Sequence, residues 1–224
     1  MASVTLAIFG ALVGAVLGST MSALAYRIPA GMNIAVARSE CPSCHVQIAA
    51  SYIVLEGSMA LLYAVLVPLY RWGITEVGIY LAVFIAVTGA IVDLKVRKIP
   101  NVLTYFGMLA EALLVVGRSI ESHSLAPILP ALIALIIFGG SLFVIGILTK
   151  GMGLGDAKLV GVIALALSSF GLYFIFYVIL GSFALGSLVG VALMVTGRAS
   201  RKSAIPFGPF ITLSFLIALL VAKL

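Results

Sequence analysis

Long apolar runs separated by short polar segments dominate the sequence. Most runs are close to the length of about 20 residues that a helix needs to cross a bilayer, and the run that starts at Asp156 is shorter. Eight runs are present, at about residues 2–26, 52–70, 74–92, 102–117, 125–148, 156–170, 172–195 and 207–222. The pattern predicts an all-α, polytopic membrane protein with about eight transmembrane helices and short loops.

The composition agrees with this prediction. The chain has 224 residues, of which 63% are hydrophobic and 9% charged, and its mean hydropathy is +1.31. Soluble domains contain about 45–50% apolar and about 25% charged residues. A cytosolic globular enzyme, a disordered protein and a disulfide scaffold are therefore excluded. We expect a single membrane domain over residues 1–224, with the lipid bilayer as a partner.

The net charge is +6. Because the basic residues lie in short loops beside apolar runs, they indicate which loops face the cytoplasm rather than a nucleic-acid partner. No Lys or Arg precedes the first run, so we expect a retained helix with its N-terminus outside and no cleaved signal peptide. This orientation places ten basic residues in the cytoplasm and three outside. The cytoplasmic ten are Arg27, Arg38, Lys95, Arg97, Lys98, Lys150, Lys158, Arg198, Arg201 and Lys202; the outer three are Arg71, Arg118 and Lys223.

The chain contains two aspartates, Asp93 and Asp156. Both lie at the predicted cytoplasmic edge of an apolar run, where an ionised carboxylate is costly and marks a functional candidate. Capping of a helix, or pairing with Lys95 or Lys158, is the structural alternative.

Three glycines, Gly151, Gly153 and Gly155, alternate before Asp156. They allow close approach of backbones and a cleft for an extended peptide. A flexible loop and a phosphate-binding loop are alternatives, but the G-x-x-x-x-G-K-[ST] pattern is absent.

Two further segments are predicted to interrupt the helices. The tripeptide at 99–101, Ile-Pro-Asn, indicates a turn before the fourth helix. The segment 205–210, Ile-Pro-Phe-Gly-Pro-Phe, is not expected to be regular helix, and it either lines a protected cavity or starts the last helix. Glu56 and Glu111 lie within apolar runs, and we expect both to face the bundle and to bond to hydroxyl groups.

These segments together resemble the motifs of the type IV prepilin leader peptidases. That family of GxGD aspartyl membrane proteases includes archaeal preflagellin peptidases and, more distantly, presenilin. The segment 153–159, Gly-Leu-Gly-Asp-Ala-Lys-Leu, resembles its second active-site motif, and Asp93 with the 99–101 turn resembles the first. Segment 205–210 and segment 19–29 are similar to its last loop and to the end of its first helix. The resemblance runs from residue 19 to about 215, with a peptidase core at 74–222.

The resemblance implies an aspartyl endopeptidase in the cell (inner) membrane. Its substrate would be a prepilin or pseudopilin, whose short basic leader is removed after a glycine at the cytoplasmic face, without a cofactor. Asp93 and Asp156 would be the catalytic pair. The residues carried over as substrate or active-site loop are Gly151, Gly153, Gly155, Lys158, Pro206, Phe207, Gly208 and Pro209.

Two close carboxyl groups suit peptide hydrolysis, because one can activate water while the other supplies a proton. Asp156 lies at a predicted helix N-terminus, where the dipole favours negative charge, and Asp93 at a C-terminus, where it does not. The sequence therefore favours Asp156 as the base and Asp93 as the proton donor.

A single cysteine pair, Cys41 and Cys44, lies in the predicted cytoplasmic loop 27–51. Many family members carry two such pairs, linked to N-methylation of the new pilin N-terminus with S-adenosylmethionine, so this loop resembles a remnant of that region. A tetrahedral zinc site needs four ligands, of which one pair supplies two. Zinc binding and methylation therefore stay open.

A different class of function is a small proton-coupled transporter or channel that uses the membrane-edge carboxylates. The position of both aspartates at one face, rather than at the midplane, argues against it. A scaffold in a pilus or secretion assembly would leave the aspartates unexplained. The sequence does not indicate an oligomeric state.

Overall fold

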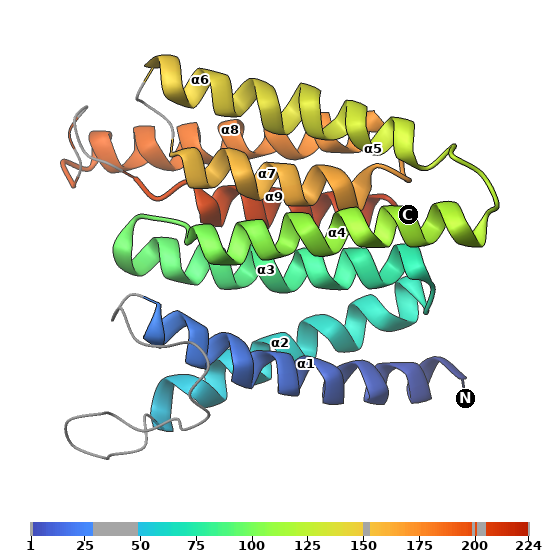
Figure 1. Ribbon diagram of the computed structural model, residues 1–224. Helices are drawn as coiled ribbons and strands as arrows, with labels where there is room; N and C mark the ends of the chain where they lie inside the picture. The colour runs from blue at the N-terminus through green and yellow to red at the C-terminus, as the bar shows by residue number, and fades with distance from the viewer. Residues whose placement is uncertain (1, 29–48, 150–152, 199, 201–204, 224) are drawn as a thin grey trace. The chain divides into compact units, whose positions relative to one another are not determined.

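The computed structural model describes residues 2–28, 49–149, 153–198, 200 and 205–223, and in these ranges the chain forms helices joined by short turns (Figure 1). Among the residues that the structure describes, six helical stretches are long and apolar enough to cross a membrane. They are α1 (Ala2–Arg27), α2 (Ala49–Tyr70), α3 (Ile74–Val96), α4 (Asn101–Glu121), the stretch Ile128–Thr149, and α8 (Leu172–Val195). The prediction of an all-α, polytopic membrane protein is confirmed.

Two apolar helices are shorter than a full span. Each of α7 (Leu154–Leu167) and α9 (Gly208–Val221) has 14 residues, which is about 21 Å of helix. Within the described ranges, the eight predicted runs thus correspond to eight helical stretches. The fifth is α5 (Ile128–Ala134), η1 (Leu135–Gly140) and α6 (Ser141–Thr149), of which η1 is π-helical.

Two boundaries differ from the predicted ones for identifiable reasons. The fourth helix continues to Glu121 because Arg118 is buried and its guanidinium donates to Ser169 Oγ and to the Leu165 carbonyl. The helix α7 ends at Leu167 rather than near residue 170, because a turn leads to Gly171, whose φ of 114° favours glycine.

The chain divides into two compact units, Met1–Glu76 and Val77–Leu224. In the first unit, α1 and α2 form a hairpin with close backbone contact. Gly10, Gly14 and Gly18 are spaced by four residues and face α2; a Cβ at Gly18 would lie 2.7 Å from the Glu56 Cα. This is the small-residue packing that replaces hydrophobic attraction between helices in lipid.

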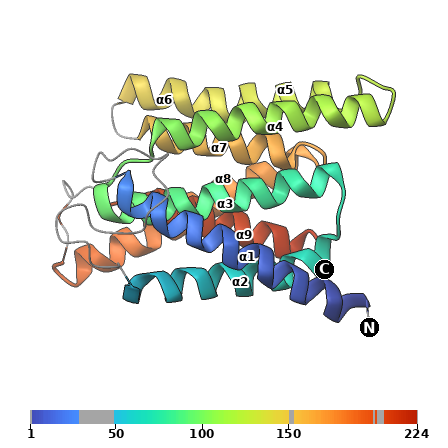
Figure 2. The same cartoon turned by 60° about the horizontal axis from the view of Figure 1, so that its bottom comes forward.

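In the second unit, α7 is the central helix. It contacts α4, the α5–η1–α6 stretch, α8 and α9, and both views place it beside α4 (Figures 1 and 2). Eleven of its 14 residues are buried, and apart from Asp156 and Lys158 its sequence is small or aliphatic throughout. The single membrane domain at 1–224 and the peptidase core at 74–222 stay predictions.

Two non-helical segments lie at the same end of this unit's helices. After α3, Arg97 takes a positive φ of 54° and its N–H donates to the Asp93 carbonyl at 2.7 Å; Pro100 then precedes the first residue of α4. The break predicted before the fourth helix is confirmed, but it covers residues 97–100, and Asn101 already belongs to α4. Residues 205–207 are not helical, as expected, and Gly208 and Pro209 open α9.

Candidate active site

Asp93 lies in the last turn of α3 and is only 4% exposed. Its Oδ2 accepts a hydrogen bond from the Gly208 N–H at 2.9 Å. Because Gly208 is the first residue of α9, the carboxyl group of Asp93 lies against a helix N-terminus, where the backbone dipoles favour negative charge. A Cβ at Gly208 would lie 3.0 Å from that same oxygen, so glycine is what allows this approach.

Asp156 lies in the first turn of α7 and is 8% exposed. Its side chain folds back toward Gly153, the residue that caps the helix, and its N–H donates to the Gly153 carbonyl at 3.0 Å. A Cβ at Gly153 would lie 2.7 Å from Asp156 Oδ2. The first glycine of the Gly-x-Gly-Asp segment therefore provides the space that this carboxyl group occupies.

The second glycine, Gly155, provides space for a different neighbour. A Cβ there would lie 2.9 Å from the Ile99 Cβ and 3.0 Å from the Ile99 carbonyl oxygen. The buried Ile99 side chain also reaches Gly208, where a Cβ would lie 3.2 Å from Ile99 Cδ1. Ile99 is thus packed between the start of α7 and the start of α9.

This packing brings the two aspartates together. Asp93 precedes the Ile99 turn on α3 and is bonded to the start of α9, while Asp156 follows Gly155 on α7. Ile99 contacts both Gly155, the residue before Asp156, and Gly208, whose N–H bonds to Asp93, so the two aspartates belong to one cluster. The predicted candidate residues Gly153, Gly155 and Gly208 all lie where they permit this arrangement; their part in a reaction stays a prediction.

Lys158 lies one turn into α7 and does not pair with Asp156 among the described residues. Its Nζ donates to Asn101 Oδ1 at 2.7 Å and lies 4.5 Å from the centre of the Tyr105 ring. Lys158 therefore connects α7 to the start of α4, just after the Ile99 turn. The sequence places Ile99 and Asn101 in the motif that follows Asp93 but does not show that they pack at the site, and their closeness to Asp93 in the chain is the signal that indicates it.

Residues 79–194, more than half of the 224-residue chain, match the type IV leader peptidase family. The chain belongs to this family. The match contains both aspartates of this leader peptidase, and residues 12–58 match the bacterial peptidase A24 N-terminal domain. No curated protein and no solved structure is similar enough to give a match.

Three of the predicted site residues of the peptidase lie outside the described residues. These are Gly151, Cys41 and Cys44. In the described ranges, no group of three or more His, Cys, Asp or Glu side chains could hold a metal ion. Whether Cys41 and Cys44 bind zinc therefore stays open.

Glu111 is a third buried carboxyl group of the peptidase, outside the pair. It faces the interior of its unit, as predicted, and is 0% exposed. The predicted bond to a hydroxyl group is wrong: in the part of the chain that the structure describes, neither of its carboxyl oxygens has a hydrogen-bond partner. The carboxyl group fits there because residue 78 is glycine: a Cβ at Gly78 would lie 2.8 Å from Glu111 Oε2. Arg118, on the same helix as Glu111, is a nearby positive charge.

Proposed function

We propose that this leader peptidase is an aspartyl endopeptidase in which Asp93 and Asp156 form the catalytic pair. The observation that carries the proposal is the convergence of the two carboxyl groups. They come from separate helices, are almost fully buried and are joined by the packing of Ile99 against Gly155 and Gly208. Neighbouring buried carboxyl groups cannot both ionise readily, so we expect this pair to share one proton.

The shared proton accounts for both halves of the reaction. The ionised carboxylate of the pair takes a proton from water as the water attacks the scissile carbonyl carbon. The protonated carboxyl then donates to the leaving nitrogen as the peptide bond breaks. Each aspartate lies beside a helix N-terminus, Asp156 that of α7 and Asp93 that of α9. The helix dipoles therefore do not show which aspartate is the base and which is the acid, although the sequence favoured Asp156 as the base.

The proposed substrate is a prepilin or pseudopilin whose short basic leader is removed after a glycine. The proposed site of cleavage is the cytoplasmic face of the inner membrane. The distribution of basic residues supports this orientation, because ten of the 13 Lys and Arg residues fall in the segments that are predicted to face that side. The substrate class is supported by the family to which the chain belongs.

The test is the intact mass of a pilin-like substrate that is co-expressed with the peptidase. Loss of the leader is expected with the wild type, and Asp93→Asn and Asp156→Asn should each lower the cleavage rate by at least about 10²-fold, as for loss of an acid or base. Glu111→Gln is the matched control, because it changes a buried carboxyl outside the pair to an amide. It should leave cleavage intact.

The same spectra test the other functions. An added methyl group on the cleaved product would show that the protein with one cysteine pair also methylates its product. Cleavage that continues in both Asn variants would refute the catalytic pair. An uncleaved substrate in all forms, with the protein folded in the membrane, would instead favour the transport function.

A further inference from the structure

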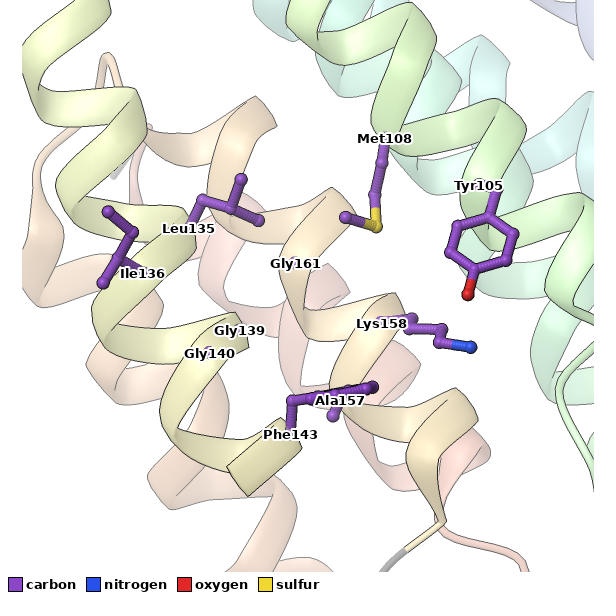
Figure 3. A pocket seen from close by; sticks show the side chains of 10 residues that line it. All are labelled: Tyr105, Met108, Leu135, Ile136, Gly139, Gly140, Phe143, Ala157, Lys158 and Gly161. Atoms are coloured by element: carbon purple, nitrogen blue, oxygen red, sulfur yellow. The ribbon is translucent and has the colours of Figure 1, made fainter. Parts of the chain in front are cut away.

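A groove lies between α4, the α5–η1–α6 stretch and α7 (Figure 3). Ala157, the residue that follows Asp156 in the chain, lines it. The volume of the groove is about 350 Å³, and its lining is almost entirely apolar. Ala157 and Lys158 line the end nearest the candidate active site, and Tyr105 of α4 and Phe143 of α6 form opposite walls. In Figure 3, α7 lies between these walls.

The groove continues along the bundle. A second hollow of about 380 Å³ shares Met108 and Leu135 with the first and extends to Val116 and Ile128. Along α4 the joined groove runs from Tyr105 to Val116, which is about 16 Å at the helical rise of about 1.5 Å per residue. This length corresponds to about three turns of a helix laid against it.

The groove is open rather than filled by the chain's own side chains. At Gly140, in the π-helical segment η1, the only atom of the described residues within 4 Å of a Cβ would be the Leu135 carbonyl oxygen, at 3.8 Å. Leu109 and Ile136 on the two rims are exposed. In a bilayer such an apolar surface is covered by lipid or by another helix, and a glycine in its wall lets a helix approach closely.

We infer that the apolar helix of the pilin-like substrate lies in this groove during cleavage, an inference that rests on the proposed function. The groove begins on the turn of α7 that carries Asp156, at Ala157 and Lys158. A substrate helix lying along α4 and α7 brings its cytoplasmic end to this point. The extended segment that precedes the helix then crosses the start of α7, where Asp156 lies.

Photo-crosslinking tests the location directly. A photoreactive phenylalanine derivative is placed at Gly140 or Leu109 in the groove, in the Asp156→Asn variant, and the pilin-like substrate is co-expressed. The matched controls are Ile137 in η1 and Leu113 in α4, which are exposed but do not line the groove. Substrate adducts are expected from both groove positions and not from either control.

Filling the groove tests its role in cleavage. Gly140→Trp places a large side chain in open space, and Ile137→Trp is the control on the same segment. Gly140→Trp should lower kcat/KM for the full-length substrate at least about tenfold, a loss of about 1.4 kcal/mol. A short peptide that ends soon after the scissile bond should be cleaved equally by the wild type and by Gly140→Trp.

The outcomes separate this inference from the proposed function. Cleavage by the wild type without groove-specific adducts would refute the groove and leave the peptidase standing. Adducts that contain only phospholipid would assign the groove to a lipid and also refute the inference. Absence of both cleavage and adducts would overturn the two proposals together, whereas adducts at Gly140 and Leu109 with cleavage would establish both.

Discussion

Replacement of Gly155 by alanine should reduce cleavage without unfolding the protein. The new Cβ would lie 2.9 Å from the Ile99 Cβ and 3.0 Å from the Ile99 carbonyl oxygen, whereas carbon atoms in contact are separated by about 3.5–4.0 Å. Neither atom of Ile99 can rotate away, because one is a carbonyl oxygen and the other is attached to the backbone. The start of α7, which carries Asp156, must therefore move by roughly 0.5–1 Å relative to the turn after Asp93.

The effects on stability and activity differ in size. Overpacking of this kind costs about 1–3 kcal/mol, and the higher helix propensity of alanine offsets about 1 kcal/mol of it. A displacement of about 1 Å at a catalytic group, in contrast, can lower the rate by about 10²-fold. We therefore expect a 10- to 100-fold fall in kcat with a small change in unfolding temperature.

The assay is the initial rate of leader removal from a purified pilin-like substrate in detergent, with thermal unfolding measured on the same preparations. Gly57→Ala is the matched control, because it is the same change in a helix and its Cβ would have no atom of the described residues within 4 Å. It should leave the rate unchanged. A Gly155→Ala rate within about twofold of the wild type, which corresponds to less than about 0.5 kcal/mol, would refute the reasoning.

Three further substitutions test other contacts. Gly208→Ala would place a Cβ 3.0 Å from Asp93 Oδ2 and should lower kcat by about tenfold with unchanged expression; an unaltered kcat would contradict this. Thr212→Val removes the bond from Thr212 Oγ1 to the Ala86 carbonyl at 2.9 Å, and should lower the free energy of unfolding by about 0.6 kcal/mol, measured by chemical denaturation in detergent. Gly14→Leu inserts a side chain where the α1 and α2 backbones touch, and should lower the unfolding temperature by more than Thr212→Val does, since overpacking costs about 1–3 kcal/mol; equal unfolding temperatures would show that the hairpin tolerates separation.

Hydropathy predicted the helices well because each depends on a local property. An apolar run of the right length must satisfy its own backbone hydrogen bonds in lipid, and only a helix does so within one segment. The interruptions at 97–100 and 205–207 were also readable, since proline lacks a backbone donor and restricts the residue before it. The π-helical segment at Leu135–Gly140 contains no proline that would indicate its irregularity from the sequence.

The contacts between helices were harder to predict from the sequence. The small residues Gly10, Gly14 and Gly18 lie against α2, but a spacing of four becomes informative only when a partner helix is known. Glu111 was expected to have a hydroxyl partner, and its neighbours instead include the backbone at Gly78 and the charge of Arg118. A sequence shows which face of a helix carries a polar group, but not which side chain lies opposite.

The sequence by itself determined the class of protein, the order of the helices and the two aspartates as candidates. These follow from local composition and from the cost of placing a charge at the membrane edge. Only the tertiary structure decided that Asp93 accepts a hydrogen bond from the Gly208 N–H and that Ile99 packs between the starts of α7 and α9. Asp93 was assigned the unfavourable end of its own helix, yet it lies at the favourable end of α9. The electrostatic environment of a carboxyl group depends on every dipole near it in space, and a residue 115 positions away in the chain supplies the decisive one here.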